Sequence, residues 1–435
     1  MSDDRCHPWT VIDLFSVAGG MSYGFQQHPQ FRVIGAVDAE RAKPSAKPGT
    51  LACNATYAAN VGVTPLAADL ATLDPAAVQK AFLGNGRPLS VLLACPPCTG
   101  FSRTLPVNHS VDDPRNSLVQ RSAAFVAALQ PTIFLMENVR ELINGNFQHH
   151  YAALNASLMD LGYVVHGAVH RLNQFGLPQK RERAVIIAVR PPFTLHTLDE
   201  LWAGFSVQPA ATYVRRAISD LPPVSAGADC PTDRMHTAPS LGAANLCRIA
   251  AIPPDGGSWA DVRADPAAAD LLTGAMHRAV AAGDLGTYPD VYGRLAWDRP
   301  AVTIKRECSH IGNGRYAHPT QNRLCTVREL AILQGFPRHY QFVAASLANR
   351  YRQIGDAVPP LISYQLARLC EWILTGSKPA IADLVLADTH LQPTDLLPTT
   401  SPVSQVAWTQ PSLLPWCKTR SKPPAGCCTS GVDGL

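Results

Sequence analysis

The sequence lacks the features that would direct it to a membrane or out of the cell. Its 435 residues contain no window of about 18 apolar residues, so no transmembrane helix is expected. Residues 1–4 (Met-Ser-Asp-Asp) are acidic and no apolar signal core follows them, which argues against a secretory signal peptide. No cluster of lysine and arginine suggests nuclear import. We therefore expect a soluble intracellular protein.

Charge is also scarce. Only 16% of the residues are charged, and 37 Lys and Arg against 33 Asp and Glu leave a formal net charge of +4. A dedicated binder of polyanions would be more one-sided, so this balance permits such a partner without requiring it. Hydrophobic residues make up 46% of the chain, which excludes wholesale disorder, and the length predicts one large or two smaller domains.

The twelve cysteines are scattered and do not form a disulfide scaffold. One Cys-x-x-Cys is present, Cys95-Pro96-Pro97-Cys98, but no second Cys-x-x-Cys or His-x-His completes a zinc tetrad, so no metal site is expected. Three interpretations of this segment stay open: a dithiol redox site, a pair of inert thiols at a strand end, or one catalytic thiolate on a rigid proline loop.

The first 190 residues alternate between short apolar runs and helical patterns. A helix is expected at about 117–130, because apolar residues recur on one side and Pro131 follows its end. Continuous apolar strands separated by helices are typical of a parallel sheet covered on both faces, so we predict a doubly wound α/β domain. Its strands are expected at residues 10–15, 91–94, 133–136 and 184–189.

The character of the chain changes at Pro191. Residues 191–300 are loop-rich, with 8 Lys and Arg against 12 Asp and Glu, whereas residues 301–375 carry 9 against 4. Residues 326–329 (Thr-Val-Arg-Glu) fit a capping box that opens a short helix, and a second helix is expected at 360–374. The predicted units are therefore a main domain at 1–190, a smaller irregular domain or insertion at 191–300, a return segment at 301–375 and a disordered or loosely attached tail at 376–435.

Chemistry-bearing residues follow several of these strands. Ligands of parallel α/β sheets gather at the carboxyl ends of the strands, so Cys98 and Glu137 are expected at one edge, with Arg181 and Arg183 able to close over it. A thiol, a carboxyl and a guanidinium in one cleft suit addition to an electron-poor ring: the thiolate attacks, the acid protonates a ring nitrogen, and the arginine holds a carbonyl oxygen.

Taken in their order along the chain, the motifs of this sequence resemble those of the DNA (cytosine-5)-methyltransferases. The resemblance covers about residues 10–375, except for the stretch 191–290. The segments that carry the resemblance are 13–20 (Asp-Leu-Phe-Ser-Val-Ala-Gly-Gly), 96–98 (Pro-Pro-Cys) with 101–102 (Phe-Ser), 137–139 (Glu-Asn-Val), 179–183 (Gln-Lys-Arg-Glu-Arg), 323–329 with 333–337 (Leu-Gln-Gly-Phe-Pro), and 353–360 (Gln-Ile-Gly-Asp-Ala-Val-Pro-Pro).

The resemblance implies a Rossmann-like methyltransferase domain with a smaller target-recognition domain at about 191–290, and methyl transfer from S-adenosylmethionine to carbon 5 of cytosine in double-stranded DNA. By this resemblance, Cys98 is expected to be the nucleophile that adds to carbon 6 of the cytosine ring. Glu137 is expected to contact ring nitrogen 3 and the exocyclic amine. Arg183, which lies beside Arg181 in the motif, is expected to contact the carbonyl oxygen of the ring. An arginine-lined pocket is expected to favour the thiolate. The target base must leave the duplex to reach these groups.

The resemblance also implies the cofactor side of the site. Phe15 and Gly20 belong to the turn that would hold the methionine part, and Pro97 lies beside the nucleophile. An acid after the second strand holds ribose hydroxyls in nucleotide-binding folds, and Asp38 stands there. The remaining expected contacts are Asp69 to the adenine amine, and Asp356 and Val358, which would close the pocket.

Three positions depart from the family pattern. Val17 replaces the first glycine of the turn, and a β-branched residue strongly disfavours positive φ, so cofactor affinity should fall if the turn uses that conformation. Thr99 replaces the usual glutamine after the nucleophile. Asp356 replaces asparagine and adds a charge near a cofactor that is cationic at sulfur.

Partners follow from the same resemblance. Phosphate contacts are expected from the basic segment 301–375, including Lys305, Arg306 and Arg315. A monomer without a membrane partner is expected, with a companion restriction endonuclease if the chain serves restriction and modification. Its location would be the cytoplasm and nucleoid of a prokaryote or the nucleus of a eukaryote.

Three other functions stay open. A relative acting on RNA is disfavoured because its Cys-Phe-Thr signature is absent. A DNA-binding protein weakened in catalysis through Val17, and a dithiol oxidoreductase using Cys95 and Cys98, complete the alternatives.

Overall fold

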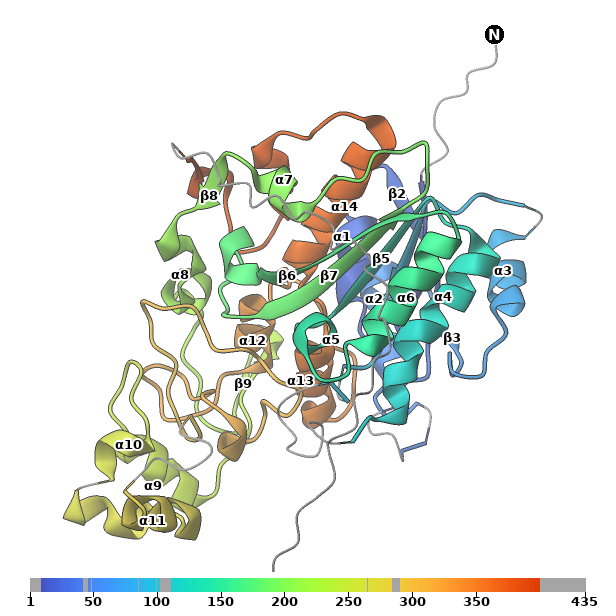
Figure 1. Ribbon diagram of the computed structural model, residues 1–435. Helices are drawn as coiled ribbons and strands as arrows, with labels where there is room; N and C mark the ends of the chain where they lie inside the picture. The colour runs from blue at the N-terminus through green and yellow to red at the C-terminus, as the bar shows by residue number, and fades with distance from the viewer. Residues whose placement is uncertain are drawn as a thin grey trace, which may run out of the picture. The chain divides into compact units, whose positions relative to one another are not determined.

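A mixed sheet organises the protein (Figure 1). The computed structural model describes residues 9–41, 46–47, 49–84, 86–98, 100–101, 111–263, 265–283 and 290–399. Among them, seven strands pair in the order β3-β2-β1-β4-β5-β7-β6. These strands are β1 (Trp9–Leu14), β2 (Phe31–Asp38), β3 (Leu66–Ala67), β4 (Val91–Ala94), β5 (Ile133–Val139), β6 (Val164–Arg171) and β7 (Glu182–Val189).

Helices cover both faces of this sheet. The helices packed around it are α1 (Gly20–Gln26), α2 (Cys53–Val61), α3 (Pro75–Leu83), α4 (Ser117–Leu129), α5 (Glu141–Asn144), α6 (His149–Asp160), α12 (Val327–Leu333), α13 (Leu347–Asp356) and α14 (Pro360–Thr375). The strands at 91–94 and 133–139 and helix α4 confirm the sequence-based predictions for those segments.

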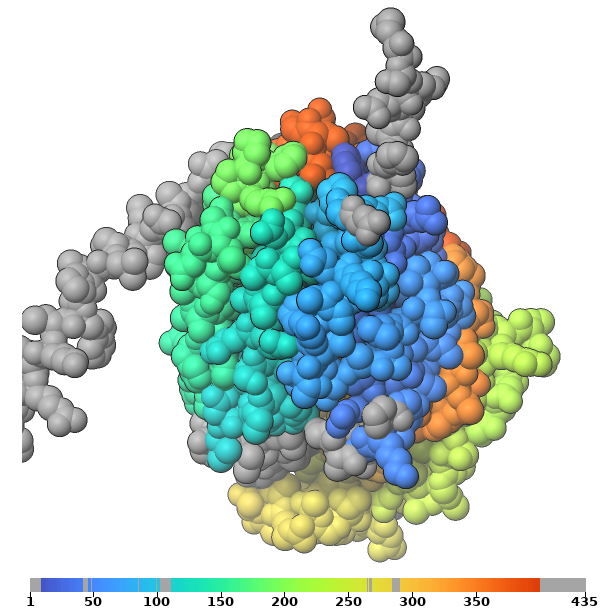
Figure 2. All heavy atoms as spheres, turned by 90° about the vertical axis from the view of Figure 1, so that its right-hand side faces the viewer, coloured from blue at the N-terminus to red at the C-terminus, as the bar shows by residue number. Residues whose placement is uncertain are grey.

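Alternate residues of each strand face two separate hydrophobic cores. In β1, Val11 belongs to the core beneath α1, α2 and α14, whereas Ile12 belongs to the core beneath α3, α4 and α6. Figure 2 shows the second of these faces, with α3 in blue and α4 and α6 in teal. Burial on both faces explains why the strands read as continuous apolar runs rather than as alternating patterns.

The predicted parallel sheet is wrong for one strand. β7 pairs antiparallel with both β5 and β6, and its residue Arg183 lies opposite Val139 of β5. The apolar run of a strand buried on both faces carries no signal for its direction. The reversal matters because it brings the first residues of β7 to the edge where β4 and β5 end.

The region after β7 shares the core beneath α14 to a large extent. Its elements are α7 (Leu198–Trp202), β8 (Phe205–Val207), α8 (Val214–Ile218), β9 (Asp229–Cys230), β10 (Asp233–Thr237), α9 (Ala243–Ala251), α10 (Trp259–Val262) and α11 (Gly274–Ala281). Trp202, Ile218 and Met235 are buried in the same cluster as α1 and α14. Among the described residues of this region, α10 and α11 build a small core of their own around Trp259 and Met276.

The predicted disordered tail is wrong for residues 377–399. Strand β11 (Leu396–Pro398) pairs with β8, and four leucines of this segment are buried: Leu384, Leu386, Leu391 and Leu396. They lie in 3-10 turns and loops, so no helical or strand period revealed them. The part of the predicted tail from residue 400 onward lies outside the described residues.

The capping box at Thr326 is confirmed. Its hydroxyl accepts the Glu329 amide at 3.1 Å, and the Glu329 carboxylate accepts the Thr326 amide at 2.7 Å. Glu329 also forms a buried ion pair with Arg323 at 2.7 Å. Helix α14 follows as predicted from residue 360. None of the helices in the described ranges is long and apolar enough to cross a membrane.

Candidate active site

The carboxyl ends of β4 and β5 and the start of β7 meet at one edge of the sheet. After β4 ends at Ala94, the chain turns through Cys95–Cys98, and Glu137 lies in the next strand. Because β7 is antiparallel, Arg183 lies in register with Val139, two residues beyond Glu137. The structure therefore brings together the residue types expected from the sequence, through an arrangement that the sequence did not reveal.

Asn138 fixes the loop that carries Cys98. Its side-chain amide donates to the Pro96 carbonyl at 3.0 Å, while its side-chain oxygen accepts the Val139 amide at 2.8 Å. The Phe101 amide donates to the Cys98 carbonyl at 3.1 Å and closes a tight turn. Thr99 and Ser102, which belong to the same motif, lie outside the described residues. Sequence analysis gave Asn138 no role, although its position between Glu137 and Val139 was noted.

Glu137 and Arg183 form a close ion pair. The distance from Arg183 Nε to Glu137 Oε1 is 2.8 Å, and each side chain is 12% exposed. No hydrogen bond to Glu137 Oε1 is found among the described residues, so this buried oxygen has the ion pair with Arg183 as its contact. Arg183 also donates to its neighbouring Glu182 carbonyl at 2.7 Å. A carboxylate oxygen in this condition suits a ligand that brings its own N–H donor.

Burial raises the pKa of the Cys98 thiol above its ordinary value. The positive charges of Arg183 and Arg181 act in the opposite direction but only in part, and the negative charge of Glu137 adds to the rise. The arginines favour the thiolate as expected, but in the protein without substrate the desolvation of the anion outweighs their attraction.

The two terminal nitrogens of Arg181 donate to the main chain, whereas its Nε is buried without a hydrogen-bond partner among the described residues. Its guanidinium donates to the carbonyls of Ile304 at 3.1 Å, Ala357 at 3.3 Å and Gly355 at 3.4 Å. Burial and the charge of Arg183 lower its pKa to about 9. Arg181 thus joins the segment around residue 304 and the end of α13 to the sheet edge.

The turn after β1 adopts the conformation that makes Val17 unfavourable. The φ of Val17 is 44°, within the left-handed region, and the φ of Phe15 is 60°. The Val17 amide donates to Asp38 Oδ2 at 2.9 Å, and the Glu40 amide donates to Asp38 Oδ1 at 2.6 Å. These two hydrogen bonds hold the turn against the end of β2, and the β-branched Val17 is kept in a strained backbone conformation there.

The segment after α13 covers this turn. A Cβ atom on Gly20 would lie 2.2 Å from the Val358 carbonyl oxygen, so only glycine permits the approach. Asp356 forms an ion pair with Arg306. The charge that Asp356 adds is therefore balanced by an arginine that sequence analysis assigned to phosphate contacts. Gly20, Val358 and Asp356 are brought together as expected.

Asp69 and Pro97 lie at the same edge. Asp69 follows β3, is partly exposed, and pairs with Arg41 at 3.2 Å while accepting the Ala71 amide at 3.0 Å. Pro97 immediately precedes Cys98 and is half-buried. Neither arrangement by itself identifies a ligand.

Most arginines of the basic segment stabilise the fold. Arg315 donates to the Gly256 carbonyl at 2.6 Å and pairs with Asp290 at 3.1 Å. Arg323 and Arg328 pair with Glu329 and Asp233. The expectation that Arg315 contacts phosphates is not supported, because its guanidinium already has these partners. Lys305 is exposed.

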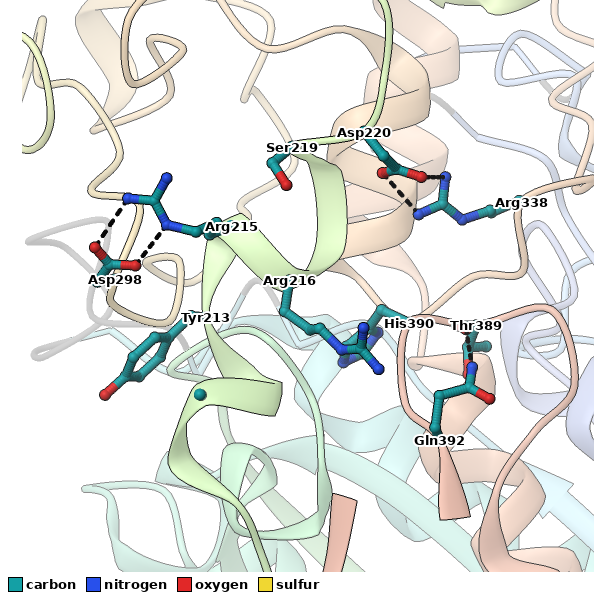
Figure 3. A pocket seen from close by; sticks show the side chains of 11 residues that line it. Tyr213, Arg215, Arg216, Ser219, Asp220, Asp298, Arg338, Thr389, His390 and Gln392 are labelled. Carbon is teal, nitrogen blue, oxygen red and sulfur yellow. Dashed lines mark hydrogen bonds and ion pairs between the residues drawn. The ribbon is translucent and has the colours of Figure 1, made fainter. Parts of the chain in front are cut away.

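A cavity of about 730 Å³ lies elsewhere, and none of the predicted site residues lines it (Figure 3). Figure 3 shows Arg215 turned toward Asp298 and Arg338 toward Asp220. Since these cations already pair with carboxylates, this cavity is not a candidate anion site.

The sheet with its reversed strand, covered by helices on both faces, defines a Rossmann-like α/β fold. A solved structure with the same fold is a putative DNA modification methyltransferase encoded within a prophage of E. coli, with a TM-score of 0.60, 21% identity, and coverage of 84% of this chain and 99% of that one.

Residues 9–372 match the C-5 cytosine-specific DNA methylases, and the chain belongs to this family. The type II methylase M.HgiDII of Herpetosiphon aurantiacus is 30% identical over 376 residues, which are 84% of this chain and 96% of that protein. The type II methyltransferase M1.HphI of Haemophilus parahaemolyticus is 30% identical over 364 residues, covering 83% and 86%. The protein is a DNA (cytosine-5)-methyltransferase.

Proposed function

We propose that Cys98 is the nucleophile of this reaction, with Glu137 and Arg183 as the residues that hold the cytosine ring. The observation that carries the proposal is the ion pair of Glu137 and Arg183 at the strand end beside the Cys98 loop. Glu137 Oε1 lacks a hydrogen-bond donor, which suits the exocyclic amine or a protonated ring nitrogen. Arg183 offers a donor to the ring carbonyl oxygen.

The Cys98 sulfur adds to carbon 6 of the base, and its proton leaves the thiol. Glu137 stabilises the charge at ring nitrogen 3, so that electron density develops at carbon 5. After carbon 5 gains the methyl group, loss of its proton restores the double bond and expels the Cys98 thiolate. Because the thiol of the substrate-free site has a raised pKa, deprotonation belongs to the complex with the base.

The methyl donor we propose is S-adenosylmethionine, which supplies an electrophilic methyl group on a positively charged sulfur. The residues fit such a group: Ser16 Oγ and Asp13 Oδ1 are buried at the end of β1 without a hydrogen-bond partner among the described residues. Asp38 lies at the end of β2, where ribose hydroxyls bind in this type of fold. Phe15, Gly20, Pro97, Asp69, Asp356 and Val358 would complete the pocket.

The proposed substrate is double-stranded DNA with the target base flipped out. Flipping costs a few kcal/mol, which contacts in the pocket offset. Of the residues expected to contact DNA phosphates, we propose Lys305, because its side chain is exposed. The names of the two type II relatives support a role in a restriction–modification system with a companion endonuclease. We propose a monomer in the cytoplasm of its host.

The test is transfer of labelled methyl from S-adenosylmethionine to unmethylated DNA, followed by bisulfite sequencing. We expect methylation at carbon 5 within one short sequence, abolished in Cys98→Ser and retained in Cys95→Ser. Loss of activity in Cys95→Ser as well as in Cys98→Ser would instead indicate dithiol chemistry. Burial raises the pKa of Cys95 well above its ordinary value, which disfavours that alternative.

A second candidate is a DNA-binding relative with weakened catalysis, which the left-handed Val17 specifically favours. In that case the wild-type chain binds DNA without detectable methyl transfer, and Val17→Gly restores transfer. Activity of the wild-type protein rules this candidate out.

A further inference from the structure

Three metal-ligating side chains gather next to the active-site segment. The ligand atoms of Asp112, His149 and His150 all lie within 4.8 Å of one another. Asp112 Oδ2 is 2.9 Å from His150 Nε2 and 3.2 Å from His149 Nε2. Two ligands on one tetrahedral metal ion with bonds of about 2.0–2.1 Å are separated by little more than 3 Å. Each ring nitrogen is therefore about as far from the carboxylate oxygen as two ligands of one ion are from each other, and all three atoms lie within 4.8 Å.

Neighbouring residues orient these ligands. The side-chain amide of Asn116 donates to Asp112 Oδ1 at 2.7 Å, and Oδ2 is the carboxylate oxygen that lies close to both histidines. The Gln120 side chain contacts His150 Nδ1 at 3.3 Å, on the ring nitrogen away from the cluster. Metal-binding histidines characteristically have their second nitrogen held in this way, because that contact fixes the tautomer and the ring orientation.

The burial of the cluster suits an ion that enters from solvent. The side chain of His150 is 9% exposed, whereas that of His149 is 59% exposed and that of Asp112 is 38% exposed. Three protein ligands with one side open to water leave a fourth coordination position for a water molecule. Two imidazoles and a carboxylate select borderline ions such as Zn²⁺, Co²⁺ and Ni²⁺ over Mg²⁺ or Ca²⁺.

The position links two elements beside the nucleophile. Asp112 precedes the 3-10 turn Pro114–Asn116 that leads into α4, whereas both histidines begin α6. The ring of Phe101, three residues beyond Cys98, contacts the His150 ring edge-on at 5.8 Å between centroids. A Cβ atom on Gly100 would lie 2.2 Å from Asn116 Oδ1, so this segment packs directly on the residues that orient Asp112.

We propose that Asp112, His149 and His150 bind one divalent transition-metal ion, with zinc as the representative. The bound ion would join the start of α4 to the start of α6 directly under Gly100 and Phe101. This site is separate from the residues proposed for methyl transfer, and it does not depend on their roles. The sequence offered a single Cys-x-x-Cys as a possible half of a metal site. The proposed ligands are instead Asp112 and two histidines nearly forty positions later, which only the fold brings together.

The experiment uses the untagged full chain, stripped with a chelator and dialysed. Zinc binding is measured by competition with a chromophoric chelator, and Co²⁺ replaces zinc to report the ligand geometry by its visible absorption. His149→Ala is the test variant because its side chain is 59% exposed. His277→Ala is the matched control, since it removes another exposed histidine far along the chain.

We expect one zinc per wild-type chain, unchanged in His277→Ala and bound at least tenfold more weakly in His149→Ala and in Asp112→Asn. Zinc should raise the melting temperature of the wild type and of His277→Ala but not of His149→Ala. Equal zinc affinity in His149→Ala and the wild type would overturn the proposal, as would the absence of stoichiometric binding to the wild type. Either result would mean that the two histidines only contact the Asp112 carboxylate and that the three residues bind no metal ion.

Discussion

Val17 is one of two non-glycine residues with positive φ in the turn after β1, the other being Phe15, and it is the β-branched one. Its φ of 44° places a β-branched residue in the left-handed region, and its amide must stay there to donate to Asp38. Such a conformation costs about 1–3 kcal/mol, part of which glycine loses again through its greater freedom in the unfolded chain. The sequence identified the residue as a problem, and the backbone supplies the reason.

We expect Val17→Gly to raise the melting temperature modestly and to lower the dissociation constant for S-adenosylmethionine several-fold. Val17→Ala is the matched control, since it removes the branched bulk but keeps the Cβ that resists positive φ. Isothermal titration with S-adenosylmethionine and thermal unfolding of the three proteins measure both effects. Equal behaviour of the alanine and glycine variants would assign the effect to bulk and contradict the role of φ.

The chemistry of Cys98 in the free protein follows from its burial. A raised pKa means that the thiol form dominates at neutral pH, and that the thiolate fraction increases as pH rises toward and beyond the ordinary range. Alkylation requires the thiolate, so it reports this fraction directly.

We expect iodoacetamide to modify Cys98 more slowly than a free thiol at pH 7.5, with a rate that rises about tenfold per pH unit through pH 9. The exposed Cys247 serves as the internal reference, and peptide mass spectrometry follows both sites in one sample. A Cys98 rate that is fast at neutral pH and flat above it would mean that the arginines win over burial after all.

The direction of β7 shows the limit of inference at the scale of elements. Its apolar run at 184–189 correctly predicted a buried strand, as did the runs of β4 and β5. Nothing in that run specifies parallel or antiparallel pairing, because both faces are buried and no polar alternation marks the register. Glu137 and Arg183, which were expected at one edge of the sheet, are nonetheless neighbours, because the reversed direction of β7 brings its first residues to that edge.

The end of α13 carries a second feature that sequence alone could not reveal. Asp356 pairs with Arg306, which lies fifty residues earlier in the chain. The negative charge of Asp356 and the positive charge of Arg306 therefore balance each other. Arg306 also lies near enough to Asp38 to lower the pKa of that buried carboxyl, against the larger upward effect of burial. The pair therefore acts on the proposed ribose contact as well.

We expect Asp356→Asn to weaken S-adenosylmethionine binding several-fold, because it removes the carboxylate that balances the Arg306 charge close to a cationic ligand. Arg306→Gln in the Asp356→Asn background should restore most of the loss. Dissociation constants for the two single variants and the double variant form a cycle whose coupling measures the pair. Additive losses would show that the ion pair does not act on the cofactor.

At the scale of the whole molecule, the chain after α14 belongs to the fold. Leu391 packs against Gly176, where a Cβ atom would lie 2.6 Å from its side chain, and His390 Nε2 lies 2.9 Å from the Gly176 carbonyl oxygen. Residues 377–399 thus cover the same core that α1 and α14 form with the sheet. Composition misled the sequence-based prediction here, because scattered leucines in turns carry no period.

We expect a chain that ends at Gly376 to melt well below one that ends at residue 399. Full burial of a leucine contributes roughly 1.5–3 kcal/mol, so the loss of four such side chains is comparable with the total stability of about 5–15 kcal/mol of an ordinary domain. Leu391→Ala in the full-length chain is the point variant for the same contact and should cost about 2–5 kcal/mol. Chemical unfolding measures all three proteins. If the chain that ends at Gly376 were as stable as the one that ends at residue 399, these leucines would contribute nothing, and the buried contact with Gly176 would have no energetic meaning.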